Sequence, residues 1–183
     1  MSVFARLFLA SCFALAAPAA GAAELAVGDA APAFSLPGTD GRIHALADHR
    51  GKRGVVIAWF PAAFTPGCTA ELQDLRDQAA AIAGYDVAVY LASVDTPEKN
   101  KDFAEAEGAK QVVLSDPGGE TAQAYGVVGP AGLYANRWTF YLDADGRILE
   151  IDKQVSTGTA GRDLARKLGE LGYPHTPRTK DPR

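Results

Sequence analysis

Three apolar runs in the middle of the chain each precede a segment with helical spacing. The first run, GVVIAWF at residues 54–60, is continuous in β-branched and aromatic side chains, which is typical of a strand buried on both faces. Comparable runs follow at residues 86–94 and 111–116. Buried strands that alternate with helices predict a sheet of parallel neighbours with helices packed on its faces.

The segments after these runs predict the helices, at residues 69–83, 96–108, 118–127 and 159–172. In the first helix, apolar residues recur every three or four positions, and Gly84 ends it. In the second, Thr96 is the expected N-cap and Pro97 occupies the first helical position.

Two pairs of short extended segments complete the pattern, at residues 34–46 around PGTDG and at residues 137–152 around ADGR. The second pair adds antiparallel strands to the parallel ones. We therefore expect one α/β domain over residues 24–174, built on a mixed sheet with flanking helices. Residues 175–183, rich in proline and polar side chains, are expected to form a mobile tail.

Residues 1–23 have the layout of a secretory signal peptide, with Arg6 before an apolar run and cleavage sites at Ala22 or Ala23. The run is shorter than the ~20 residues that a membrane-spanning helix needs. A lipid anchor at Cys12 is the less favoured alternative, because the apolar run continues past that residue. We expect a periplasmic or secreted protein.

The chain has 2 cysteines, and removal of the signal peptide would leave Cys68 alone. Exported proteins usually pair their cysteines, so a single thiol indicates either a reactive group or an intermolecular partner. The alternative is a buried cysteine that acts as a small hydrophobic side chain.

The position of Cys68 favours the reactive interpretation. A free thiol with a pKa of ~8.5 is mostly protonated at neutral pH, whereas the thiolate is the nucleophile. The start of a helix favours an anion through its partial positive charge and its free N–H groups. Pro66 and Gly67 form a narrow turn before Cys68, and Thr65 can offer a hydroxyl to the same site.

Other classes of function fit less well. The formal charge of −4 and the lack of a basic cluster argue against nucleic acid as a partner. A dithiol oxidoreductase would need a second cysteine where Thr65 stands. The three histidines, His44, His49 and His175, are scattered and are interpreted as surface residues, so no metal site and no general base for acyl transfer is expected. The candidate reaction that remains is attack of the thiolate on a peroxide, which yields a sulfenic acid.

The stretch PAAFTPGC at residues 61–68 resembles the peroxiredoxin active-site motif P-x-x-x-T-x-x-C. Four segments follow in the order seen in peroxiredoxins: CTAELQDLRD, SVDTPEKNKDFAE, VVLSDPGGETAQAYGV and NRWTFYLDADGRI. The resemblance runs from about Gly28 to Gly172 and is strongest to the bacterioferritin-comigratory, or Q-type, branch. It implies a thioredoxin-like fold and thiol-dependent reduction of hydrogen peroxide and organic hydroperoxides without a cofactor.

The resemblance also implies roles for individual residues. Cys68 matches the peroxidatic cysteine, Thr65 the motif threonine, and Arg137 an arginine on a neighbouring strand. Arginine suits the site because its guanidinium stays charged and can donate to two oxygens at once. The expected pocket residues are Pro61, which shields the sulfur, Gly67 and Glu71, although Glu71 could equally serve the helix dipole or the surface.

Two departures from the family pattern matter. Many Q-type members carry a resolving cysteine five residues after the peroxidatic one, where this chain has Gln73. We therefore expect a one-cysteine form reset by an external thiol (thioredoxin-like, glutaredoxin or low-molecular-weight) or by Cys68 of a second copy in a homodimer. Ala63 and Phe64 resemble type-five members, so the subfamily stays open. The alternative functions are a peroxide sensor and a thiol–disulfide carrier.

Overall fold

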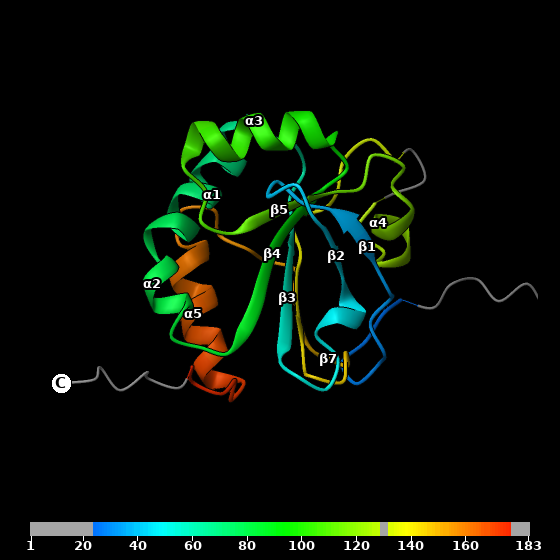
Figure 1. Ribbon diagram of the computed structural model, residues 1–183, viewed down its shortest axis with the longest axis vertical. Coiled ribbons are helices and arrows are strands. Elements are labelled where there is room, and N and C mark those ends of the chain that lie inside the picture. The colour runs from blue at the N-terminus through cyan, green and yellow to red at the C-terminus, as the bar shows by residue number, and fades with distance from the viewer. Residues whose placement is uncertain (1–23, 129–131, 177–183) are drawn as a thin grey trace, which may run out of the picture.

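A computed structural model describes residues 24–128 and 132–176 of the chain (Figure 1). The expected signal peptide at residues 1–23, with Cys12, and the last residues of the expected tail lie outside this range. In chain order the elements are β1 (Ser35–Pro37), β2 (Ile43–Ala45), the 3-10 helix η1 (Leu46–Asp48), β3 (Gly54–Trp59), α1 (Pro66–Asp77), α2 (Ala79–Ile82), β4 (Val87–Ser93), α3 (Pro97–Glu107), β5 (Val112–Ser115), α4 (Glu120–Ala124), β6 (Thr139–Leu142), β7 (Ile148–Asp152) and α5 (Ala160–Glu170).

Five strands form the central sheet in the order β5-β4-β3-β6-β7. β3 lies in the middle, parallel to β4 and antiparallel to β6, and all its residues are buried. β5 continues the parallel half, and β7 continues the antiparallel half. The mixed sheet expected from the apolar runs is thus confirmed, and so is the antiparallel pairing of β1 with β2.

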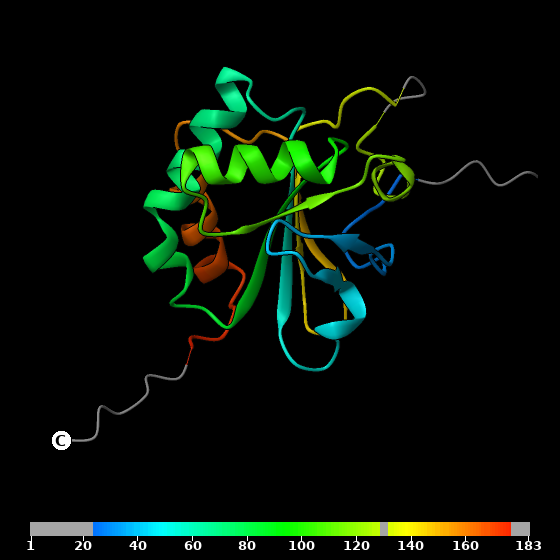
Figure 2. The same ribbon diagram turned by 45° about the horizontal axis from the view of Figure 1, so that its top comes forward.

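Helices and the small hairpin cover opposite faces of this sheet. On one face, α1, α2, α3 and α5 pack onto a core that includes Val56, Leu91 and Cys68. On the other face, the β1–β2 hairpin, η1 and α4 pack onto Ile57 and Phe140. Figure 1 shows α1, α2 and α5 along one side of the sheet, and Figure 2 shows that α1 and α3 both begin at the end where β3 and β4 finish.

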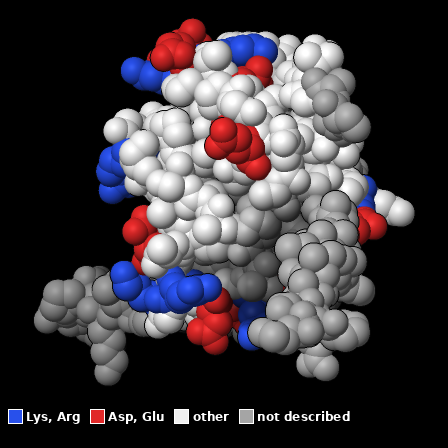
Figure 3. Space-filling view, turned by 90° about the vertical axis from the view of Figure 1, so that its right-hand side faces the viewer, with Lys and Arg blue, Asp and Glu red and all other residues white. Residues whose placement is uncertain are grey.

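Figure 3 shows the face of the molecule on the side of the β1–β2 hairpin and α4. Most of the described surface in this view carries neither basic nor acidic side chains; the visible charges lie around its edges, apart from one acidic group in the upper middle.

The first predicted helix differs from the observed one at both ends. Helix α1 begins at Pro66, earlier than expected, because Thr65 is extended and Pro66 starts the helical backbone. The expected continuous helix is broken at Gln78, and the short α2 follows. The break lets Ile82 pack into the same core as α1 and α5. By contrast, Thr96 caps α3 as predicted, accepting a hydrogen bond from the Lys99 N–H at 3.3 Å.

The first two residues of the expected tail, His175 and Thr176, are among the described residues and contact the rest of the domain. The backbone N–H of Thr176 donates to the Gly84 carbonyl at 2.9 Å, and the His175 ring stacks on Tyr85 with centroids 4.5 Å apart. Within residues 24–128 and 132–176, no helix is both long enough and apolar enough to cross a membrane.

The interpretation of His49 as a surface residue is wrong, because its side chain is 7% exposed. A directed chain of hydrogen bonds explains its burial. Arg53 Nε can only donate, so His49 Nδ1 accepts (3.2 Å), and His49 Nε2–H then faces the Tyr90 hydroxyl at 2.9 Å. The Tyr90 hydroxyl in turn donates to His44 Nδ1 at 3.1 Å, which leaves His44 Nε2–H for Asp40 at 2.9 Å.

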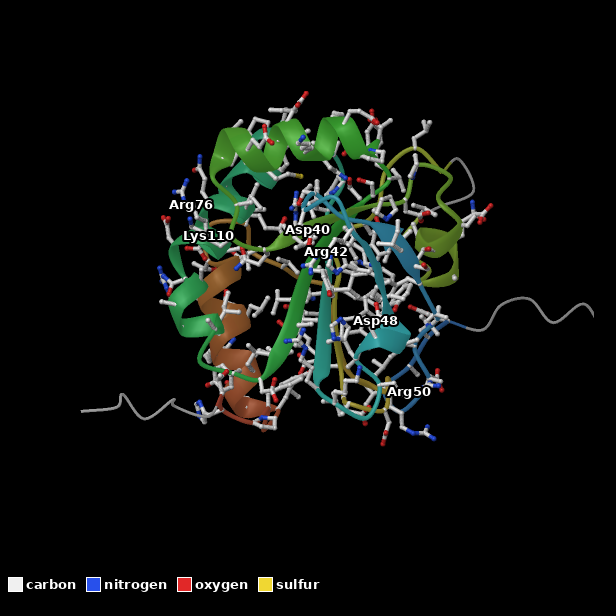
Figure 4. All side chains as sticks on the ribbon, in the orientation of Figure 1. Asp40, Arg42, Asp48, Arg50, Arg76 and Lys110 are labelled. Atoms are coloured by element: carbon white, nitrogen blue, oxygen red, sulfur yellow. The ribbon has the colours of Figure 1, made fainter. Side chains whose placement is uncertain are left out.

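Four members of this chain of hydrogen bonds line a groove of about 760 Å³ that touches none of the predicted site residues: Arg53, His49, Tyr90 and His44. Figure 4 shows Asp40 and Arg42 close together on the hairpin, with Lys110 across the groove from them. Arg42 and His44 both bind Asp40, and these contacts, against the cost of burial, leave the pKa of the Asp40 carboxyl at about 2.

Burial, together with the nearby charge of Arg53, lowers the pKa of His49. The unfolded chain takes up a proton at this imidazole near pH ~6.5, before the folded protein does. The stability that neutral His49 contributes is therefore present above about pH 6.5 and lost as the pH falls below it. We expect the pH dependence of urea unfolding in this range to be shallower in His49→Gln, which can keep both hydrogen bonds without titrating. Equal slopes in the two proteins would contradict this assignment.

Candidate active site

Cys68 lies where the central strand passes into its helix. β3 ends at Trp59, the chain crosses residues 60–65, and α1 begins at Pro66. Cys68 is in the first turn of α1, where backbone N–H groups lack helical partners and the helix dipole favours an anion. The residue is only 2% exposed, so the sulfur is held within the protein and not at its surface.

Arg137 supplies a cation to the sulfur. Its Nη2 lies 3.2 Å from Cys68 Sγ, within the range of a hydrogen bond to sulfur. The two residues are distant in sequence, but β6 is the antiparallel neighbour of β3, and Trp59 N–H donates to the Trp138 carbonyl at 2.9 Å. This register brings Arg137 beside the end of β3, from which the loop to Cys68 departs.

Glu71 is the partner of Arg137. It lies one turn after Cys68 on α1, its side chain is 1% exposed, and its carboxylate forms an ion pair with Arg137 Nη1. A buried carboxylate without a partner would be costly, so this contact accounts for the burial of Glu71. Of the roles left open for Glu71, the geometry favours orientation of the guanidinium toward the sulfur.

Thr65 and Gly67 border the sulfur in different ways. The Thr65 hydroxyl donates to the Ala62 carbonyl at 3.0 Å, which fixes the turn before α1 and leaves the hydroxyl oxygen as an acceptor. Gly67 lies beside the guanidinium, because a Cβ at this position would stand 3.4 Å from Arg137 Nη2. Pro61 is half-buried at the start of the loop. The site therefore gathers Cys68, Arg137, Glu71 and Gly67, with Thr65 and Pro61 in the adjoining loop.

One residue of this region was not predicted. Asp95, which follows β4, accepts a hydrogen bond from the Ala63 N–H in the loop before α1, at 2.8 Å. Its signal in the sequence is a polar residue directly after a buried strand, at the sheet edge where reactive groups gather.

The arrangement suits nucleophilic attack on a small polar molecule. A thiolate at Cys68 would be stabilised by the helix start and by Arg137, and the same guanidinium can donate to an oxygen bound next to the sulfur. A hydroperoxide group is small, so the site does not require the large groove beside His49. Within the described part of the chain, no three side chains of the kind that bind metals are gathered into a cluster.

Comparisons with known proteins agree with this chemistry. Residues 27–151 match the model of the AhpC/TSA family. The chain is 41% identical over 151 residues to a candidate peroxiredoxin of Mycobacterium tuberculosis, an alignment that covers 79% of this chain and 96% of the relative. It is 38% identical over 139 residues to the peroxiredoxin Bcp of Escherichia coli, covering 73% of this chain and 88% of that protein.

The similarity to peroxiredoxins is also found in solved structures. The crystal structure of the peroxidoxin BcpB from Mycobacterium tuberculosis superposes with a TM-score of 0.71 at 30% identity, covering 79% of this chain and 96% of the other. The expected thioredoxin-like α/β fold is thereby confirmed.

Proposed function

Because this chain belongs to the AhpC/TSA family of peroxiredoxins, thiol peroxidases that reduce hydroperoxides, we propose that Cys68 is the residue that attacks the peroxide. The observation that carries the proposal is the 3.2 Å contact between Arg137 Nη2 and the Cys68 sulfur at the start of α1. A thiol that served only as core packing would not need a partly buried guanidinium beside it.

The reaction begins with the thiolate of Cys68 and a hydroperoxide whose terminal oxygen approaches the sulfur. A sulfur–oxygen bond forms as the oxygen–oxygen bond breaks, so the sulfur is oxidised to a sulfenic acid and the departing oxygen leaves as hydroxide or alkoxide, which takes a proton from solvent to become water or an alcohol. Arg137 donates to the peroxide oxygens as negative charge develops on the departing one, and Glu71 holds the guanidinium in place.

We further propose that an external thiol resets the sulfenic acid. Cys68 is the one cysteine of the described residues, and the position five residues later is Gln73. An incoming thiol would displace water to form a mixed disulfide, and a second thiol would release Cys68.

With residues 1–23 acting as a signal peptide, this chemistry would take place in the periplasm or outside the cell, with a reductant present there.

The test is peroxide consumption by the purified protein with excess dithiothreitol. We expect many equivalents to be consumed per chain, and Cys68→Ser to abolish turnover because an alcohol is not a thiolate nucleophile at neutral pH. Prepared with residues 1–23 retained, Cys12→Ser is the matched control and should retain full activity.

Two outcomes would contradict the proposal. Consumption of a single equivalent, followed by arrest, would indicate a peroxide sensor. Oxidation of Cys68 no faster than that of free cysteine would remove the peroxidase role of this site altogether. Mass spectrometry of the mixed disulfide formed after peroxide treatment would identify the external thiol.

A further inference from the structure

The loop between β3 and α1 is attached to the rest of the protein by a carboxylate from the segment that follows β4. Asp95 Oδ2 accepts the Ala63 N–H at 2.8 Å, and the Asp95 side chain is 11% exposed. Ala63 itself is buried, so its N–H needs a protein partner. Asp95 makes no contact with Cys68, and any effect on the sulfur must act through the loop.

The carboxylate is itself held from several directions. Lys99, one turn into α3, donates to Oδ1 at 2.5 Å, and the Ser93 hydroxyl lies 3.0 Å from Oδ2. Beneath Ser93, Asn100 is fully buried and donates through Nδ2 to Ser93 Oγ at 3.0 Å and to Ser115 Oγ at 2.8 Å. This buried network ties the ends of β4 and β5 to α3, so Asp95 is presented by a rigid part of the fold.

The loop it holds is conformationally strained. Phe64 has a φ of +65°, a left-handed conformation that is unfavourable for a bulky side chain and costs on the order of 1–3 kcal/mol. The Phe64 ring packs edge-on against Phe103 of α3 at 5.2 Å between centroids. The strained residue therefore lies directly after the N–H that Asp95 binds, and directly before Thr65, the N-cap of α1.

From these contacts we propose that Asp95 is a positioning residue for the peroxidase reaction. Its bond to Ala63 keeps the loop in the strained conformation that sets Thr65 and the first turn of α1, and with them the Cys68 sulfur, in register with Arg137. The inference rests on the proposed role of Cys68. A displacement of about 1 Å in a reacting group can cost about 100-fold in rate, so a loop contact without any role in the chemistry can matter this much.

The test compares two reactions of Cys68 in Asp95→Ala. Attack on hydrogen peroxide needs alignment of the sulfur with Arg137, whereas alkylation by iodoacetamide needs only an accessible thiolate. Both rates are measured at a pH high enough for Cys68 to be ionised in wild type and variant, so that a change in the thiolate fraction affects neither. We expect the single-turnover rate with peroxide to fall about 100-fold, while alkylation stays the same or becomes faster because the loop opens. A loss of overall stability alone would not separate the two rates in this way.

Two further variants locate the effect. Asp95→Asn retains an oxygen that can accept the Ala63 N–H and should recover most of the peroxide rate, whereas Lys99→Met removes the ion pair and leaves the loop contact, so its rate should fall only a few-fold. The inference is overturned if Asp95→Ala reacts with peroxide at the wild-type rate, if its peroxide and alkylation rates fall together, or if Asp95→Asn is as slow as Asp95→Ala. A wild-type protein that is itself unreactive toward peroxide would instead refute the proposed function.

Discussion

Replacing Arg137 with leucine is expected to slow the reaction of Cys68 with peroxide by about 100- to 1000-fold, the range seen when one donor to a developing oxyanion is removed. The guanidinium is the group that contacts both the sulfur and Glu71, so its loss removes a cation from the thiolate and a donor from the peroxide. The single-turnover rate of thiol loss after mixing with hydrogen peroxide measures this effect.

The same substitution should also destabilise the fold. It leaves the Glu71 carboxylate, 1% exposed, without its partner, and breaking a buried ion pair in this way costs about 3–5 kcal/mol in the free energy of unfolding. Urea unfolding would measure the loss. A rate measured on Arg137→Leu alone would therefore mix a chemical effect with a structural one.

A double variant separates the two effects. In Glu71→Gln with Arg137→Gln, two neutral amides replace the buried charges, and we expect most of the stability to return while the peroxide rate stays low. The peroxide rate of Arg137→Lys should lie between the rates of the wild type and of the double variant, since an ammonium keeps the charge but cannot donate to two oxygens in the geometry of a guanidinium. Recovery of the peroxide rate in the double variant would show that Arg137 acts only by holding α1 to the sheet.

Replacing Gly161 with alanine is expected to give the largest loss of stability without touching the site. Gly161 is in the first turn of α5, and a Cβ there would stand 2.5 Å from the Asp74 carbonyl oxygen and 2.8 Å from Leu75 Cα on α1. Both are backbone atoms, so the two helices would have to separate. The Gly161 N–H also donates to the Asp74 carboxylate at 2.7 Å, and separation would break this bond as well.

We expect Gly161→Ala to lower the free energy of unfolding by about 1–3 kcal/mol, the usual cost of overpacking, with further loss as the bond to Asp74 is broken. The matched control is Gly158→Ala, a few residues earlier, where a Cβ would meet nothing within 4 Å. Urea unfolding of the two variants should differ clearly, and equal midpoints would mean that α1 and α5 do not approach as closely as described.

Much of the fold could be predicted from local patterns. The strands from β3 to β7, the hairpin of β1 and β2, and the capped start of α3 follow from runs, turns and caps that lie within a few residues of one another. The break at Gln78 could not be predicted, because the apolar spacing continues across it and only packing against α5 favours two helices. The burial of His49 depends on Tyr90 and Arg53, which approach it only in the folded chain.

The residues of the candidate site also differ in whether local sequence patterns could predict them. Cys68 and Thr65 stand out in one short motif, and Arg137 could be assigned only by resemblance to a family. The pairing of Arg137 with Glu71 depends on the register of β6 against β3. The left-handed Phe64 had no signal at all, since the loop AAFTP contains no glycine and the conformation is imposed by Asp95 and Phe103.

The two halves of α1 are held by different partners, the first by Arg137, which lies just before β6 of the sheet, and the second by α3. Gln73 Nε2 donates to Glu107 at 2.7 Å and Arg76 Nη1 donates to the Glu107 carbonyl at 2.8 Å, so the second half of α1 is joined to the end of α3. An external thiol can reach the buried sulfur only if the first turn opens, and such a short opening should close again within microseconds, since helix elongation takes nanoseconds per residue.

Reclosing would then be much faster than disulfide exchange. The opening step would remain at equilibrium during turnover, and the rate of reduction should be proportional to the small open fraction multiplied by the concentration of the thiol. Substitutions that stabilise the first turn of α1 would reduce the open fraction. They would slow the reduction of oxidised Cys68 by the same factor, whatever the identity of the reductant.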